Sequence, residues 1–82
     1  MRTINMNYPV IDPVATGNRI DVLRRDRGIS VAAIRDYLGL STTYAIYKWF
    51  HGVSMPSLDN LVAIGALLDV PLDALIVRKN IE

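Results

Sequence analysis

STTYAIYKWFHG, residues 41–52, holds most of the aromatic side chains of this sequence in one short segment. It contains the only tryptophan, the only phenylalanine and the only histidine of the chain, which are Trp49, Phe50 and His51. An α-helix advances about 100° per residue, so Trp49 and Phe50 fall within about 60° of Ile46. This apolar stripe predicts a helix over residues 43–51 with one face in a hydrophobic core.

The opposite face of this predicted helix has a different chemistry. It presents two phenols, an ammonium group and an imidazole, which belong to Tyr44, Tyr47, Lys48 and His51. The segment contains no acidic residue. Tyrosine and lysine both reach phosphates, and tyrosine also contacts base edges and thymine methyl groups. The alternative is that the tyrosines lie against neighbouring loops and the lysine is only solvated. Exposed aromatic residues are also typical of a protein–protein interface.

The composition of the whole chain is that of one small globular domain. It has 82 residues, of which 51% are hydrophobic and 21% are charged, and a chain of this size folds around a modest core. It contains no cysteine, so a disulfide framework and a thiolate metal site are excluded. No run approaches the roughly 18 to 20 apolar residues of a membrane span, and the first residues make a poor signal peptide. We expect a cytoplasmic protein with no membrane partner.

The sequence offers little for an enzyme. It has no glycine-rich phosphate loop and no metal-ligand spacing, and His51 has no obvious acidic residue nearby to orient it. An imidazole at a predicted helix C-terminus more simply favours the helix dipole or a phosphate. We therefore expect no catalytic residue, no metal, no cofactor and no small-molecule ligand.

The net charge of +1 hides an uneven distribution of charge along the chain. Residues 16–53 carry six basic and three acidic side chains, whereas residues 54–77 carry three acidic side chains and no basic one. A basic half beside an acidic half suggests an anionic partner on one side of the molecule. The alternative is a solvated surface whose asymmetry has no function.

Glycines and prolines divide the sequence into five short helical segments. We expect these helices to start near Thr16, Ser30, Thr43, Pro56-Ser57 and Pro71. The first is predicted over residues 16–27, with Thr16 as its N-cap. Residues 1–14 contain two prolines and are expected to be extended or disordered. The predicted organisation is an extended arm over 1–15, a domain over 16–79 and a tail over 80–82. The predicted fold class is all-α, a compact five-helix bundle that contains a helix-turn-helix.

Five pieces of the sequence, taken together, resemble a known family. They are RIDVLRRDRGIS (19–30), IRDYLGLS (34–41), IYKWFHG (46–52), MPSLDNLVAIGALLDV (55–70) and PLDALI (71–76). Their order, lengths and glycine and Pro-Ser positions resemble the Cro/phage-repressor class of helix-turn-helix domains, also called the xenobiotic-response-element class, and among these the small stand-alone bacterial regulators. The resemblance implies a DNA-binding transcriptional regulator of the repressor type, associated with the nucleoid.

The resemblance also assigns roles to residues. The positions that match the base-contacting residues of the family are Thr43, Tyr44 and Lys48, with Tyr47 beside them. The positions expected at the sugar-phosphate backbone are Ser30, Thr42, His51, Gly52, Ser54 and Arg24. In the family the second helix of the pair enters the major groove of double-stranded DNA.

Two departures from the family pattern affect the predicted reading surface. One extra residue lies between Gly39 and Ile46, so the turn at Ser41-Thr42 is longer than usual, and this can shift the reading helix by one position. Position 31 is valine where the family commonly has glutamine, and valine cannot donate a hydrogen bond to a phosphate.

A third departure concerns Arg24. Phe50 stands where many relatives have an acid that pairs with the arginine matching Arg24. We therefore expect Arg24 to have lost its partner, and either to stack on Phe50 or Trp49 or to meet a phosphate.

The resemblance implies a homodimer on an inverted-repeat operator, because one helix-turn-helix reads only a few base pairs. The candidate dimer surfaces are the fifth helix with Ile76 and Val77, and the arm with Met6, Tyr8, Val10 and Ile11. The main alternative is a protein-interaction module, or an antitoxin-like partner protein, that uses the same aromatic face. DNA binding should weaken steeply with salt, whereas a protein interface built on tyrosines should be much less sensitive.

Overall fold

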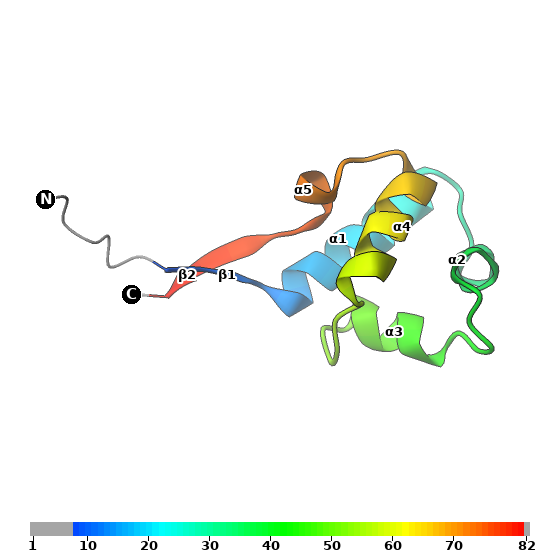
Figure 1. The fold of residues 1–82 in the computed structure, drawn as a ribbon, viewed down its shortest axis with the longest axis horizontal. Helices are drawn as coiled ribbons and strands as arrows, with labels where there is room; N and C mark the ends of the chain where they lie inside the picture. Colours follow the sequence, from blue (N-terminus) through cyan, green and yellow to red (C-terminus); the bar gives the residue numbers. More distant parts are fainter. Residues whose placement is uncertain (1–7, 82) are drawn as a thin grey trace, which may run out of the picture.

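The computed structural model describes residues 8–81, which form a helical body and a two-stranded ribbon (Figure 1). The helices are α1 (Pro13–Asp26), α2 (Val31–Leu38), α3 (Tyr44–Phe50), α4 (Leu58–Leu68) and α5 (Leu72–Leu75), and the strands are β1 (Tyr8–Ile11) and β2 (Arg78–Ile81). The predicted five-helix fold is confirmed. The two strands were not predicted.

One hydrophobic core holds the helical body together, and all five helices contribute to it. Its buried members are Ile20, Val31, Ile34, Ile46, Trp49, Phe50, Leu61, Ile64, Leu68 and Leu75. Burying one side chain of this size contributes about 1.5–3 kcal/mol to stability. The stripe that predicted α3 faces this core, so helical spacing correctly identified the packed face of that helix.

The start of α1 differs from the prediction. Asp12, and not Thr16, is the N-cap, and its carboxylate accepts a hydrogen bond from the Ala15 N–H at 3.0 Å. Pro13 occupies the first helical position, where its missing N–H costs nothing and its fixed φ suits the helix. The prediction that residues 13 and 14 are non-helical is therefore wrong.

Thr16 has a different function from the one predicted for it. Its side chain is completely buried, and its hydroxyl joins α1 to the chain just before β2. The hydroxyl oxygen accepts from the Val77 N–H at 3.0 Å and donates to the Val77 carbonyl at 3.3 Å. A buried hydroxyl needs such partners, because leaving it unpaired costs more than the bonds contribute.

Gly17 sets the distance between α1 and α3. A Cβ atom at this position would lie 1.9 Å from the Trp49 carbonyl oxygen and 2.9 Å from that of Phe50. Only glycine lets the two backbones approach this closely. The orientation of α3 is therefore fixed by backbone contact with α1 as well as by the core.

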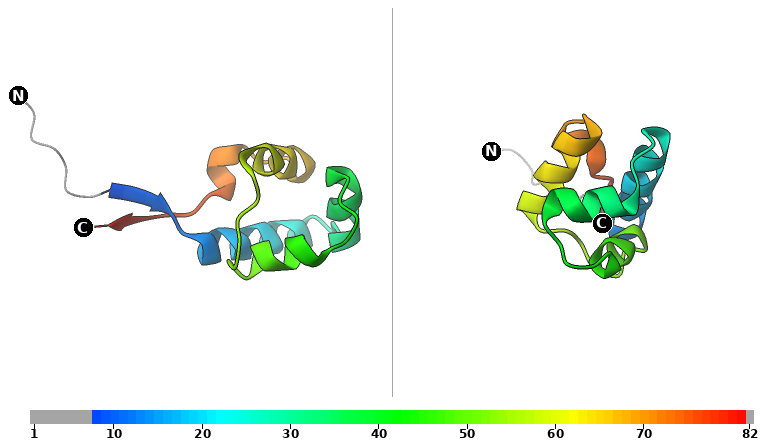
Figure 2. Two further views of the ribbon diagram at one scale, coloured as in Figure 1. Left: turned by 60° about the horizontal axis from the view of Figure 1, so that its bottom comes forward. Right: turned by 90° about the vertical axis from the view of Figure 1, so that its right-hand side faces the viewer.

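The ribbon consists of β1 and β2, which pair antiparallel with Tyr8 opposite Ile81 and Ile11 opposite Arg78. It leaves the body at the end opposite α2, as the views in Figures 1 and 2 agree. The extended conformation predicted for the arm is confirmed over residues 8–11. Residues 80 and 81, predicted as a tail, are part of strand β2. Met6, named as part of a dimer surface, lies outside the described residues.

Candidate nucleic-acid interface

The inner face of α3 fixes the helix in the body. Ile46, Trp49 and Phe50 are all buried, as their spacing predicted. Gly39 ends α2 in the left-handed conformation at φ 71°, which only glycine adopts readily, and residues 40–43 connect the two helices. The short connection and the buried stripe together hold the opposite face of α3 toward solvent.

The outer face of α3 presents Tyr44 and Lys48 side by side. Tyr44 is 71% exposed, and the Lys48 ammonium nitrogen lies 5.3 Å from the centre of its ring. This cation–π contact orders a charged donor next to an aromatic surface without neutralising its charge. Among residues 8–81, no ion pair involves Lys48. Both groups are available to a partner.

Tyr47 has one side against the body and one in solvent. Its ring meets the edge of Phe50 at 5.9 Å between centroids and an interplanar angle of 88°, an arrangement that aromatic pairs favour. Its side chain is nevertheless 47% exposed. The packing restricts the ring to one orientation, so Tyr47 adds a rigid surface beside Tyr44 and Lys48.

In the turn before α3, the hydroxyl that accepts a backbone hydrogen bond is not the one at the N-cap position. Thr43 occupies the N-cap position, but its side chain makes no capping hydrogen bond. The Thr42 hydroxyl accepts from the Tyr44 N–H at 3.3 Å instead. The hydroxyl that accepts at this helix start therefore lies one residue before the N-cap position, and the Thr43 hydroxyl is free of that role.

The predicted phosphate contacts lie at the N-terminus of α2 and in the loop after α3. The Ser30 hydroxyl caps α2 by accepting from the Ala33 N–H at 3.0 Å. In the loop, the N–H groups of Gly52 and Val53 donate to the Trp49 and Lys48 carbonyls. Because these N–H groups are already paired, the loop offers side chains to a phosphate, namely those of His51 and Ser54.

Gly52 is required by the fold at this point. Its φ is 71°, in the region that favours glycine, and a Cβ atom there would lie 2.7 Å from Val14 at the start of α1. The loop therefore packs directly against α1. Because Gly52 has no side chain and its N–H is paired with the Trp49 carbonyl, its contribution to the predicted phosphate contacts is the shape of this loop.

Arg24 has an acidic partner, Asp21, which the family resemblance did not indicate. Its guanidinium donates to the Asp21 carboxylate at 2.8 Å and lies 5.2 Å from the centre of the Phe50 ring. The predicted stacking on Phe50 is confirmed. Position 50 offers no acid, as expected, but Asp21 supplies a different acidic partner that was not predicted. Asp21 is three residues earlier on the same helix, a spacing that brings side chains together. A phosphate at Arg24 would have to compete with this carboxylate.

Two features of this surface were not anticipated. Asp21 also pairs with Arg25 at 3.1 Å, and the i, i+3 and i, i+4 spacing of these residues was the available signal. Tyr37 on α2 is 52% exposed. Its position off the Ile34 and Leu38 stripe could have identified it as a surface aromatic residue.

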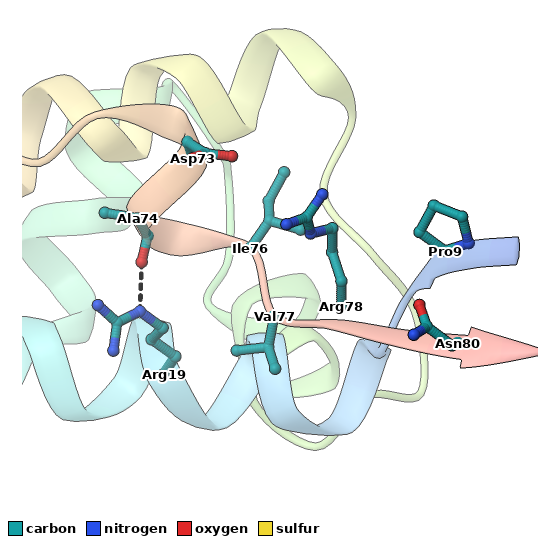
Figure 3. Close-up of a pocket in the computed structure, with 8 residues that line it drawn as sticks. All are labelled: Pro9, Arg19, Asp73, Ala74, Ile76, Val77, Arg78 and Asn80. Atoms are coloured by element: carbon teal, nitrogen blue, oxygen red, sulfur yellow. Dashed lines mark hydrogen bonds between the residues drawn. The ribbon is translucent and has the colours of Figure 1, made fainter. Parts of the chain in front are cut away.

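Residues 8–81 contain neither a cluster of metal ligands nor a helix that could span a membrane. No group of metal-ligating side chains within residues 8–81 is arranged to hold an ion. Over the same residues, every helix is too short or too polar to cross a bilayer. An open cleft lies at the base of the ribbon, lined in part by Arg19, Asp73 and Arg78 (Figure 3). It contains none of the residues predicted to contact DNA.

Comparison with known proteins agrees with this geometry. A family model described as Helix-turn-helix matches residues 22–75. The chain is similar to the restriction-modification controller protein C.AhdI from Aeromonas hydrophila, with 26% identity, a TM-score of 0.70 and coverage of 78% of this chain and 96% of that chain.

It is also similar to the P22 c2 repressor, solved in complex with a synthetic operator, with 30% identity, a TM-score of 0.66 and coverage of 73% and 89%. The biofilm regulator SinR, solved in complex with DNA, shares the fold at 24% identity and a TM-score of 0.65, with coverage of 73% and 95%. A search of curated proteins finds no match.

Proposed function

The chain belongs to the helix-turn-helix family of DNA-binding transcriptional regulators, and we propose that it is a sequence-specific repressor that reads its operator with α3 in the major groove. The observation that carries this proposal is the outer face of α3. It combines an exposed Tyr44 ring with the Lys48 ammonium. A rigid helix face with a cation and hydrogen-bonding phenols matches the donors and acceptors of the groove.

The proposed base contacts come from the first two turns of α3. Lys48 donates to guanine acceptors or to phosphates, and the Tyr44 and Tyr47 hydroxyls contact base edges or phosphates. Thr43 contributes a hydroxyl that no cap hydrogen bond occupies.

The proposed backbone contacts lie on either side of α3. Ser30 stands at the start of α2 and Thr42 at the turn before α3. His51 and Ser54 stand in the loop after α3, where Gly52 shapes the backbone. Arg24 joins them only where a phosphate displaces Asp21. Such contacts set the position of a protein on DNA without specifying sequence.

We further propose a homodimer that binds an inverted repeat. One α3 of seven residues spans only a few base pairs, whereas two copies related by a two-fold axis read two half-sites about one helical turn apart. Operator occupancy would repress transcription by excluding other proteins from the same DNA, and it would place the protein on the nucleoid.

Selection of bound duplexes from a random DNA pool at near-physiological salt tests the function directly. Enrichment of an inverted repeat is the expected result, and it gives the half-site spacing. If folded protein enriches no sequence, the repressor assignment is wrong. A protein partner of the Tyr44 and Tyr47 face would then be the next target.

Lys48 variants test the contact surface on the selected operator. Lys48→Ala should weaken binding and reduce the slope of log affinity against log salt by about 1.8, because each of the two copies on the operator releases one fewer counterion. Lys48→Arg is the matched control, since it keeps the charge and should keep the slope. If Lys48→Ala left both the affinity and the slope unchanged, the proposal that α3 lies in the major groove would be wrong.

A further inference from the structure

The β1–β2 ribbon is incomplete as a sheet. It has only two strands of four residues each, and it projects from the helical body (Figure 1). Two isolated strands are marginal in water, and three or more are normally needed for independent stability. Within residues 8–81, neither outer edge of the ribbon has a neighbouring strand.

The hydrogen bond at the base of the ribbon shows which backbone groups face outward. The Asp12 N–H donates to the Val77 carbonyl at 2.8 Å. Antiparallel pairs alternate between hydrogen-bonded and non-hydrogen-bonded positions. The next hydrogen-bonded pair along the register is therefore Val10 with Lys79. The intervening residues direct their N–H and C=O groups to the outer edges. These are Pro9 and Ile11 on β1, and Arg78 and Asn80 on β2.

The two edges differ in their capacity to accept another strand. Pro9 has no N–H, so the β1 edge lacks one of its donors, as is common where an edge must stay unpaired. The β2 edge keeps both donors and both acceptors, from Arg78 and Asn80. The β2 edge is therefore the one suited to pairing.

We propose that two copies of this protein associate through their β2 edges. A two-fold axis at Lys79 places Arg78 of each copy opposite Asn80 of the other. Each such pair exchanges two backbone hydrogen bonds, so all four donors and all four acceptors of the two edges are satisfied. The product is a four-stranded antiparallel sheet in the order β1-β2-β2-β1. This inference rests on the proposed homodimer and names its surface.

The side chains divide between the two faces of the ribbon in a way that permits this pairing. Pro9, Arg78 and Asn80 line the cleft at the base of the ribbon (Figure 3). Alternation along a strand places Lys79 on the other face with Val10. In the paired sheet Arg78 lies beside the Asn80 amide of the second copy, and the two Lys79 side chains lie opposite each other.

The Lys79 pair gives the interface a distinctive response to salt. Like charges directly opposite on neighbouring strands are unfavourable, and salt screens them. Dimer formation should therefore strengthen as salt rises, whereas DNA binding weakens. Lys79→Thr should tighten the dimer about two- to fivefold at low salt. An acidic peptide bound at the same edge would respond in the opposite sense, because Lys79 would attract it.

Cross-linking tests the register. The chain has no cysteine, so Lys79→Cys introduces one thiol on each copy. A non-hydrogen-bonded pair holds its Cα atoms about 4.5 Å apart, which suits a disulfide. Mild oxidation should give a covalent dimer.

Val10→Cys is the matched control, because it lies on the same face but one strand further from the axis. It should stay monomeric under the same oxidation. If Val10→Cys formed a covalent dimer and Lys79→Cys did not, association through the β2 edge would be wrong.

Sedimentation equilibrium without DNA tests the hydrogen bonds. Asn80→Pro removes an outward donor and leaves the β1–β2 bonds intact, so it should raise the dimer dissociation constant about tenfold or more. Ile11→Pro makes the same change on the other edge and should leave the constant unchanged.

The outcomes separate this inference from the proposed function. One outcome is that the wild type is a dimer, that Lys79→Cys gives no disulfide-linked dimer and that Asn80→Pro does not weaken association. This outcome would overturn the β2 interface, while the proposed homodimer would stand. A wild-type protein that sediments only as a monomer, yet enriches an operator, would overturn the inference and the dimer while DNA reading stands.

Discussion

Gly17→Ala should destabilise the protein strongly, because the added methyl group meets backbone and not a side chain. The new Cβ would lie 1.9 Å from the Trp49 carbonyl oxygen, whereas such contacts are normally about 3.3 Å or longer. Along that line α1 and α3 must separate by about 1.4 Å. Overpacking costs about 1–3 kcal/mol, and alanine recovers up to about 1 kcal/mol of helix propensity. A carbonyl cannot rotate away, so the net loss should be about 2–3 kcal/mol.

Thermal unfolding followed by circular dichroism measures this loss. A domain of this size loses about 4–8 °C of melting temperature per kcal/mol, so the expected drop is about 10–20 °C. Asn18→Ala is the control, because its side chain is exposed on the same helix and should change stability by less than about 0.5 kcal/mol. Equal melting temperatures for the wild type and Gly17→Ala would show that α1 and α3 do not make the described contact.

Three further predictions concern other contacts. Thr16→Val should cost about 1–3 kcal/mol in urea unfolding, because the Val77 N–H loses its buried acceptor; an unchanged midpoint would contradict this contact. Leu68→Ala should cost about 2–5 kcal/mol, because its side chain is fully buried, and a smaller loss would mean that the core collapses around the cavity. Ser30→Ala and Ser57→Ala each remove a cap and should each cost about 1 kcal/mol. Only Ser30→Ala should also weaken operator binding, and equal affinities for the two variants would remove Ser30 from the interface.

The helices were predictable because their signals are local. Ser30 and Ser57 cap α2 and α4 as expected, and apolar residues at helical spacing form the core. The start of α1 was missed although Asp12-Pro13 is itself an N-terminal signal. Thr16, which was predicted as the N-cap, is instead buried, and its hydroxyl bonds to Val77. Such a contact between distant residues leaves no local pattern.

The strands could not be predicted in the same way. Each is only four residues long, β1 contains a proline, and β2 contains Arg78 and Lys79. Their pairing is visible only when the fold brings residues 8–11 and 78–81 together. The two faces of α3, one of which is the candidate DNA surface, were easier to predict, because their pattern is contained in seven residues. The family pattern did not indicate that Asp21 pairs with Arg24, although their spacing of three residues permits it.

The pairing of β1 with β2 also has a consequence for the order of folding. The two strands are about 70 residues apart, so closing this loop carries a large entropic cost that local helix contacts do not. The local contacts among α1 to α4 can therefore form before β1 and β2 pair. The proposed DNA-reading face of α3 then forms before the β2 edge does. A refolding chain therefore forms the outer face of α3 before the edge that we propose joins two copies, and association through that edge follows folding.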